Sequence, residues 1–322
     1  MGAGPFVDGF RLTTPGALVA ALAITSLTTL CCAWRWSVVA AGLGVDIPVR
    51  PAVGAYYRSQ FLNSALPGGV LGDVNRGVRH GRDVNDMGRS LRSVAWERGS
   101  GQAVQIVATV AVLLLIARPA VPANMAVSSM VIAVIGVGLL VGIRRSKRAT
   151  RTDSARGGRT LDPPHLAARI TRGITTDLRD AVLTRRAGPR IVLASIAALL
   201  GHVVVFAVAL RTSGTAVPAG QLLPLALVVL LGAAVPTSIA GWGPREGASA
   251  WAFGTIGLGA AEGVTVAVVY GVLVLFATLP GAVLLLADRW GNSRSAIRGP
   301  ARGGARELAE APAQRVGGVA HA

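Results

Sequence analysis

The stretch IVLASIAALLGHVVVFAVAL (191–210) decides the fold, because its 20 residues include no charged side chain. A helix needs about 20 mainly apolar residues to cross the hydrocarbon core of a bilayer. Further stretches of mainly apolar character lie at 15–44, 103–116, 121–143, 222–235 and 264–287. The sequence therefore predicts an all-α integral membrane protein whose helices form a polytopic bundle.

Charge and hydropathy together narrow the class of protein. The 322 residues are 52% hydrophobic, with a mean hydropathy of +0.56, yet their formal net charge is +17. A nucleic-acid-binding protein would spread its basic residues over a wettable surface. Here the basic residues lie between apolar runs, as the positive-inside rule describes for loops near anionic headgroups. We therefore expect membrane lipids as partners and no nucleic acid.

The chain is expected to have three regions: an N-terminal tail (1–13), a polytopic membrane domain (14–290) and a disordered basic C-terminal tail (291–322). No cleavable signal peptide is expected at the N-terminus. The polar loop 144–190 starts with a basic cluster and is placed in the cytoplasm. Apolar residues at every fourth position predict an amphipathic helix over 163–186, with Asp162 as its N-cap. This helix either lies on the membrane surface or packs against the cytoplasmic mouth.

Two apolar stretches, 52–77 and 235–259, are broken by glycine and proline. They contain LPGGVLGDVNRG (66–77) and VPTSIAGWGPREG (235–247), and each runs from a proline through small residues to a charged pair. The pairs are Asp73 with Arg76 and Arg245 with Glu246. We interpret the two stretches as a weak internal repeat of re-entrant segments that line a site, with membrane-edge loops as the alternative.

A polar stripe leads into the third apolar run. Arg89, Ser93, Glu97, Gly101 and Gln105 recur every fourth residue, so on a helix they share one face that should meet protein or water. Glu97 and its neighbour Arg98 stand where an ionisable pair needs partners. The two side chains either belong to a site or snorkel to the interface and pair locally.

Two other polar features lie within apolar runs. His202 suggests either a proton relay or a hydrogen bond to a neighbouring helix, and the second is favoured because no other histidine or carboxylate shares its face. Trp34, Arg35 and Trp36 are interpreted as an aromatic and basic anchor at headgroup level.

Motifs for soluble chemistry are missing from the sequence. Cys31 and Cys32 are the only cysteines and are adjacent, which excludes a disulfide framework and a cysteine-based metal cluster. No metal-ligand spacing, nucleophile elbow or phosphate loop is present. We expect no metal site, no cofactor and no catalytic residue, and an enzyme is the less favoured class.

Three segments carry a resemblance to a known family: FLNSALPGGVLGDVNR (61–76), SVAWERGSG (93–101) and VPTSIAGWGPREGASAWAFGTIG (235–257). In this order they resemble the lysylphosphatidylglycerol synthase transmembrane region, a family of flippase-like membrane proteins, over about Thr14 to Trp290. The resemblance implies a multi-pass protein of the bacterial cytoplasmic (inner) membrane that moves or handles lipids. Its best-known members flip an aminoacylated phospholipid, which a separate soluble domain makes. The sequence shows no counterpart of that domain, so synthase activity is not implied.

The residues and the resemblance together predict a cavity for a lipid headgroup. Its expected residues are Asn63, Pro67, Gly68, Gly69, Gly72, Asp73, Arg76, Glu97, Arg98, Pro236, Gly241, Gly243, Arg245 and Glu246. The leading hypothesis is a lipid translocase or lipid-binding protein for an anionic or aminoacylated phospholipid or another lipid-linked headgroup. One alternative is a membrane-embedded transferase with Glu97 or Asp73 as base. Another is a non-catalytic scaffold that recruits partners through the basic loop and tail, and the sequence does not indicate an oligomeric state.

Overall fold

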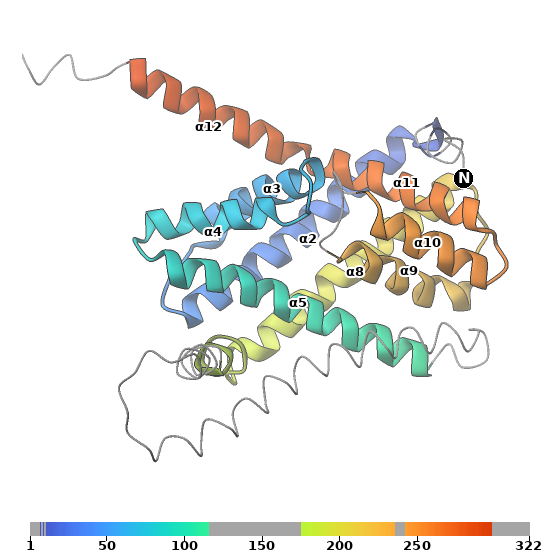
Figure 1. Cartoon of the computed structure of the whole chain (residues 1–322), viewed down its shortest axis with the longest axis horizontal. Coiled ribbons are helices and arrows are strands. Elements are labelled where there is room, and N and C mark those ends of the chain that lie inside the picture. The colour runs from blue at the N-terminus through green and yellow to red at the C-terminus, as the bar shows by residue number, and fades with distance from the viewer. Residues whose placement is uncertain (1–6, 8, 10, 116–174, 236–241, 298–322) are drawn as a thin grey trace, which may run out of the picture. The chain divides into compact units, whose positions relative to one another are not determined.

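The computed structural model describes residues 7, 9, 11–115, 175–235 and 242–297. The elements of this part of the chain are helices (Figure 1), which confirms the predicted all-α membrane protein. They are α2 (Pro15–Gly42), α3 (Val49–Ala65), α4 (Leu71–Asp83), α5 (Met87–Leu115), the π-helical turn η1 (Leu178–Val182), α8 (Ala187–Ser213), α9 (Ala219–Ala233), α10 (Pro244–Thr255), α11 (Ala260–Ala277) and α12 (Leu279–Ile297). The helix expected over 121–143 lies outside the described residues.

Four stretches are long and apolar enough to cross a membrane within the described residues: Pro15–Gly42, Met87–Leu115, Ala187–Ser213 and Ala260–Trp290. The last contains α11 and part of α12, and the backbone turns at Thr278 between them. Pro280 explains the turn, because a proline has no N–H to bond the carbonyl four residues earlier. The chain is thus a multi-pass membrane protein.

The described residues form two compact units, one up to Ala282 and one from Val283 onward. In the first unit α2 packs against α8. Two apolar cores lie beside this pair, one around the N-terminal half of α2 and the other around its C-terminal half. One core joins the N-terminal half of α2 to α8, α9, α10 and α11, and it includes Phe206, Phe253 and Leu273. The other joins the C-terminal half of α2 to α3, α5, η1 and α8 around Trp36.

The same order of elements occurs twice in this unit. Helix α2 is followed by the pair α3–α4 and then by the long helix α5, while α8 is followed by the pair α9–α10 and then by α11. In both pairs the two helices pack against each other, so each is a helical hairpin. The motifs 66–77 and 235–247 therefore occupy equivalent places in the two halves, between the two helices of each pair and at the start of the second.

Glycines at the turn and at the start of α4 let the first hairpin close tightly. Gly68 and Gly69, in the turn, have φ angles of 90° and 61°, a left-handed conformation that favours glycine. A Cβ atom on Gly72 would lie 2.0 Å from the backbone oxygen of Ser59, so only glycine lets α4 approach α3 this closely. The Asn63 side chain accepts a hydrogen bond from the Gly72 N–H at 2.8 Å and fixes the start of α4.

Helix α4 buries several polar side chains and exposes two apolar side chains near its start. Asp73, Arg76 and His80 are buried, whereas Leu71 and Val74 are 49% and 50% exposed. A surface helix of a soluble protein shows the opposite arrangement. The apolar side chains lie near the hairpin turn, and exposed Arg82 and Asp83 lie at the far end of α4.

In the second hairpin, α10 starts at Pro244 directly after Gly243, which has a φ angle of 125°. Proline is favoured at the first helical position because its missing N–H is not needed there. The Glu246 carboxylate accepts a hydrogen bond from the Gly243 N–H at 2.6 Å. Residues 236–241, which join the two helices, lie outside the described part.

Helix α5 contains all five residues of the predicted polar stripe, and this face meets protein or open space as expected. Ser93 and Glu97 are fully buried, Gly101 contacts the Arg35 guanidinium, and Gln105 faces the cavity described below. Of the helix predicted over 163–186, the described part is helical from 175 to 182, and Asp177 pairs with Arg92 of α5 at 2.8 Å. At the other end of the chain α12 continues beyond Trp290 to Ile297.

Candidate functional site

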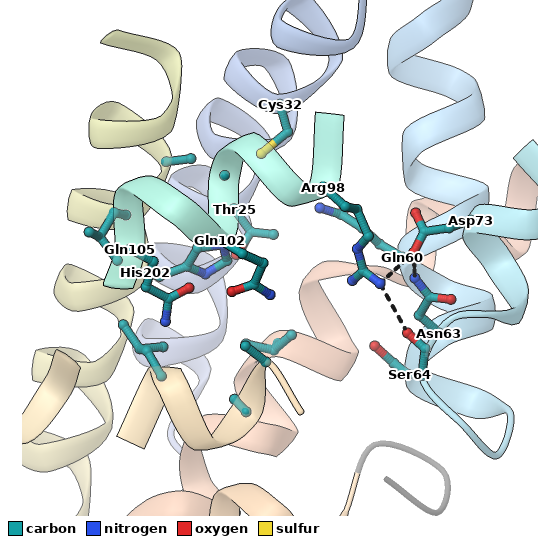
Figure 2. A pocket seen from close by; sticks show the side chains of 18 of the residues that line it. Thr25, Cys32, Gln60, Asn63, Ser64, Asp73, Arg98, Gln102, Gln105 and His202 are labelled. Carbon is teal, nitrogen blue, oxygen red and sulfur yellow. Dashed lines mark hydrogen bonds and ion pairs between the residues drawn. The ribbon is translucent and has the colours of Figure 1, made fainter. Parts of the chain in front are cut away.

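A cavity of about 330 Å³ opens between the first hairpin, α2, α5, α8 and the second half of the unit. Figure 2 shows polar side chains on several sides of it. Amide groups come from α3 and α5, His202 comes from α8, and three arginines, Asp73 and several hydroxyl groups also belong to the polar lining. The amides and arginines are Gln60, Asn63, Gln102, Gln105, Arg35, Arg98 and Arg245.

Asp73 lies at the wall of this cavity and is saturated with donors. Its carboxylate accepts hydrogen bonds from the Ser59 hydroxyl at 3.0 Å and the Asn63 amide at 2.8 Å. It also pairs with Arg76 at 2.9 Å and with Arg98 of α5 at 2.7 Å. The Asp73 carboxylate thus connects α3, α4 and α5.

Glu97 lies behind the lining and is fully buried. It forms ion pairs with Arg35 of α2 at 2.5 Å and with Arg76 of α4 at 3.0 Å. The Tyr56 hydroxyl is the third partner and donates a hydrogen bond to the Glu97 carboxylate at 2.9 Å. Burial raises the pKa of Tyr56 well above its usual value and the Glu97 charge raises it further, so the phenol stays a donor. Glu97 therefore ties four helices together and did not snorkel to the interface.

Each hairpin holds one buried arginine in a similar setting. Arg76 lies 4.5 Å from the Trp36 ring and 4.2 Å from the Tyr56 ring, and it pairs with Asp73 at the third position of α4. Arg245 lies 5.1 Å from the Trp242 ring and 5.6 Å from the Tyr270 ring. It pairs with Glu246, the third residue of α10. A tryptophan, a tyrosine and a carboxylate thus surround both guanidinium groups, which favours the charged form.

Two glycines on other helices make room for guanidinium groups. A Cβ atom on Gly271 of α11 would lie 2.3 Å from Arg245, and one on Gly101 of α5 would lie 2.7 Å from Arg35. A side chain at either position would force the facing guanidinium group to shift. The glycines therefore belong to the site although neither carries a side chain.

Five of the fourteen expected residues line the cavity: Asn63, Gly69, Asp73, Arg98 and Arg245. Arg76, Glu97 and Glu246 lie behind them as ion-pair partners. Pro67 and Gly68 form the hairpin turn, while Gly72 and Gly243 shape the starts of α4 and α10. Pro236 and Gly241 lie outside the described residues. One member of each charged pair, Asp73 in the first hairpin and Arg245 in the second, lines the same cavity. Asp73 pairs with Arg76 of its own hairpin and Arg98 of α5, whereas Arg245 pairs with Glu246 of its own hairpin.

The interpretation of residues 34–36 as a headgroup anchor is wrong for Arg35 and Trp36. Arg35 is 7% exposed and pairs with Glu97, and Trp36 is fully buried and donates to Ser93 at 2.9 Å. The sequence offered one signal for the burial of Arg35. A buried charge needs a partner of opposite sign, and Glu97 stands beside another apolar run. Tyr56, Gln60, Gln102 and Tyr270 were also missed, and no sequence pattern marks them.

His202 takes the favoured role of the two considered for it. Its Nδ1 lies 3.3 Å from the Tyr270 hydroxyl of α11, so it hydrogen-bonds to a neighbouring helix. No group of three or more metal-ligating side chains occurs among the residues that the structure describes. The site is thus an array of arginines, amides and hydroxyls in a membrane protein.

A multi-pass helical membrane protein with a polar cavity is the class that the fold and site define. The family model described as "Lysylphosphatidylglycerol synthase TM region" matches residues 1–281. The chain belongs to this family, which indicates a membrane protein involved in lipid handling. No curated protein matches the chain, and no solved structure matches it.

Proposed function

We propose that this chain holds a lipid headgroup in the cavity and moves it between the leaflets while the acyl chains stay in the bilayer. The observation that carries the proposal is the polar cavity beside four apolar spans. A headgroup that enters hydrocarbon loses its hydrogen bonds to water, which is costly unless other partners replace them. The arginines and amides of the cavity provide such partners.

In this proposal both hairpins dip into the bilayer without crossing it. Helices α3, α4 and α10 have 17, 13 and 12 residues, fewer than the roughly 20 that a span needs. Leu71 and Val74, which are exposed near the turn, suit lipid, and the exposed Arg79, Arg82 and Asp83 farther along α4 suit the headgroup region. Re-entrant segments commonly line the site of a transporter.

Within this function Arg98 and Arg245 contact the headgroup, with Asp73, Asn63 and Gly69 beside them. Arginine suits this role because its planar fork donates two parallel hydrogen bonds to a phosphate. Arg76, Glu97 and Glu246 act as positioning residues behind the lining. The glycines and prolines of the two breaks shape the hairpins. The protein resides in the bacterial cytoplasmic membrane, with the loop 144–190 in the cytoplasm.

The transferase alternative has less support from the geometry. A general base needs a free lone pair directed at its substrate. Glu97 accepts from Arg35, Arg76 and Tyr56 and does not border the cavity. Asp73 borders it but already accepts from four donors. Both carboxylates are better suited to hold arginines than to take protons.

Transport of a fluorescent phospholipid in proteoliposomes tests the proposal. We expect Arg98→Gln and Arg245→Ala each to slow headgroup movement at least about tenfold, because each removes charge-assisted hydrogen bonds. Arg98→Gln is the cleaner variant, since Asp73 keeps three other donors. The control Arg89→Gln, at an exposed ion pair, should keep the rate within about twofold. Unchanged movement in both cavity variants would remove the proposal.

A further inference from the structure

The charges that border the cavity are mostly of one sign. Arg35, Arg98 and Arg245 line it, and Asp73 is the one carboxylate in the lining formed by the described residues. Carboxylates behind the lining neutralise Arg35 and Arg245 through ion pairs. Apart from Asp73, the groups that a ligand would meet first are therefore cationic or neutral.

The Asp73 carboxylate has no capacity left for a cationic ligand. Its two oxygens already accept from the Ser59 hydroxyl, the Asn63 amide, Arg76 and Arg98. An ammonium group in the cavity would have to displace one of these donors while lying beside three guanidinium groups. Only neutral oxygens, such as those of Gln102 and Gln105, would accept from it. A desolvated charge without a counter-charge is expensive, so the site disfavours cations.

Unused guanidinium donors are available for an anion. Arg98 pairs through Nη1 alone, its side chain is 41% exposed, and its Nε and Nη2 bond nothing else in the described chain. Arg245 uses Nε and Nη2 for Glu246, which leaves Nη1. A phosphate oxygen can accept from such donors without breaking an existing ion pair.

Neutral donors and acceptors make up the rest of the polar lining. The Gln102 and Gln105 side chains point into the cavity in Figure 2 and make no hydrogen bond with other described residues. Thr25 also lines the cavity, and its hydroxyl is buried without a hydrogen-bond partner in the described part of the chain. A buried polar group normally has a partner, so this hydroxyl points to a ligand or water. Amides and hydroxyls suit the hydroxyl groups of a ligand, because both partners can donate and accept.

We infer that the cavity selects a phosphodiester headgroup that carries free hydroxyl groups, such as glycerol or another polyol, and rejects aminoacylated, cationic headgroups. The inference rests on the proposed function and specifies its ligand. Arg98 and Arg245 take the phosphate, and Gln102, Gln105 and Thr25 take the hydroxyl groups. The cavity volume of about 330 Å³ suits a headgroup, because sites for small ligands span roughly 300–1,000 Å³.

Binding to the purified full chain in detergent tests the selection. The probes are dihexanoyl phosphatidylglycerol, its lysyl ester, dihexanoyl phosphatidic acid and soluble sn-glycerol 3-phosphate, titrated by calorimetry at fixed ionic strength. Phosphatidylglycerol should bind at least about tenfold more tightly than the lysyl ester and more tightly than phosphatidic acid. The soluble ester should bind more weakly than the lipid, because it lacks the acyl chains.

Two variants separate the roles of the lining. Gln102→Leu with Gln105→Leu should bring the affinity for phosphatidylglycerol to within about twofold of that for phosphatidic acid. Arg98→Gln should weaken both lipids about tenfold. The control Gln221→Leu changes a glutamine that does not line the cavity and should leave all affinities unchanged.

The outcomes distinguish this inference from the proposed function. Equal or tighter binding of the lysyl ester, or no binding of phosphatidylglycerol, overturns the inference, and the transport of a labelled lipid still decides the proposed function. Tighter binding of sn-glycerol 3-phosphate than of the lipid identifies a soluble ligand and overturns both. Preference for phosphatidylglycerol that is lost in the glutamine variant supports the inference.

Discussion

Seven charged side chains around the cavity form a nearly neutral set, with four arginines against three carboxylates. Six of the seven are under 9% exposed, so they would be costly without partners. They are Arg35, Arg76, Arg98, Arg245, Asp73, Glu97 and Glu246. Glu97 is fully buried, and its carboxylate pairs with arginines of two other helices, Arg35 of α2 and Arg76 of α4.

We expect Glu97→Gln to lower the free energy of unfolding by about 3–5 kcal/mol, because Arg35 and Arg76 would lose a buried counter-charge. Unfolding by denaturant in detergent micelles measures the change. Arg89→Gln breaks an exposed pair with Asp86 and should cost less than about 1 kcal/mol. If both variants unfolded at the same denaturant concentration, the network would not stabilise the fold.

The first hairpin shows at the level of elements how a polar helix can lie in a membrane protein. Helix α4 buries Asp73 and Arg76 against α3 and α5 and exposes Leu71 and Val74. Its close approach depends on Gly72 at the contact with Ser59. The burial of Asp73 and Arg76 fits the proposal of a re-entrant hairpin, because polar groups inside a bilayer must face protein or a cavity.

Matched substitutions on α4 test whether its turn end faces lipid. We expect Val74→Asp to destabilise the protein in lipid nanodiscs by up to about 2.5–3.5 kcal/mol, since a carboxylate would enter hydrocarbon. Val84→Asp, at the C-cap of α4 and 37% exposed, should be nearly neutral. Equal stability of the two variants would place the hairpin turn in water and contradict the re-entrant proposal.

Across the whole molecule, two helix–hairpin–helix halves meet along α2 and α8, and the cavity draws residues from both halves. Among the residues that the structure describes, those that line it fall between Thr25 and Thr278. A transport function therefore predicts that the cavity works without the basic C-terminal segment. This separates a transport function from a scaffold that recruits partners through its tail.

Truncation after Ile297 should leave the rate of lipid movement in proteoliposomes within about twofold of that of the full chain, because the cavity stays complete and the removed charges affect at most surface electrostatics. Arg245→Ala in the full chain serves as the inactive reference. A truncated protein that reconstitutes normally but moves no lipid would favour the scaffold.

Local sequence determined most of the helices, the four apolar spans and the two breaks, although the stretch 222–235 forms the shorter helix α9 instead of a span. The length of an apolar run sets whether a helix can cross a bilayer, and proline and glycine interrupt hydrogen bonding wherever they occur. The recurrence of polar residues at every fourth position of α5 also predicted that Ser93, Glu97 and Gln105 share one side of the helix. These properties depend on neighbours within a few residues, so they can be read from the chain alone.

Only the tertiary structure decided which charges meet. Arg35 and Glu97 are 62 positions apart, and their pairing depends on how α2 and α5 rotate against each other. The same rotation turned Trp36 inward and brought Gln102 to the cavity, although neither belongs to a recognisable pattern. Helix packing sets this rotation through contacts between distant segments such as Gly101 and Arg35, and no local periodicity encodes such contacts.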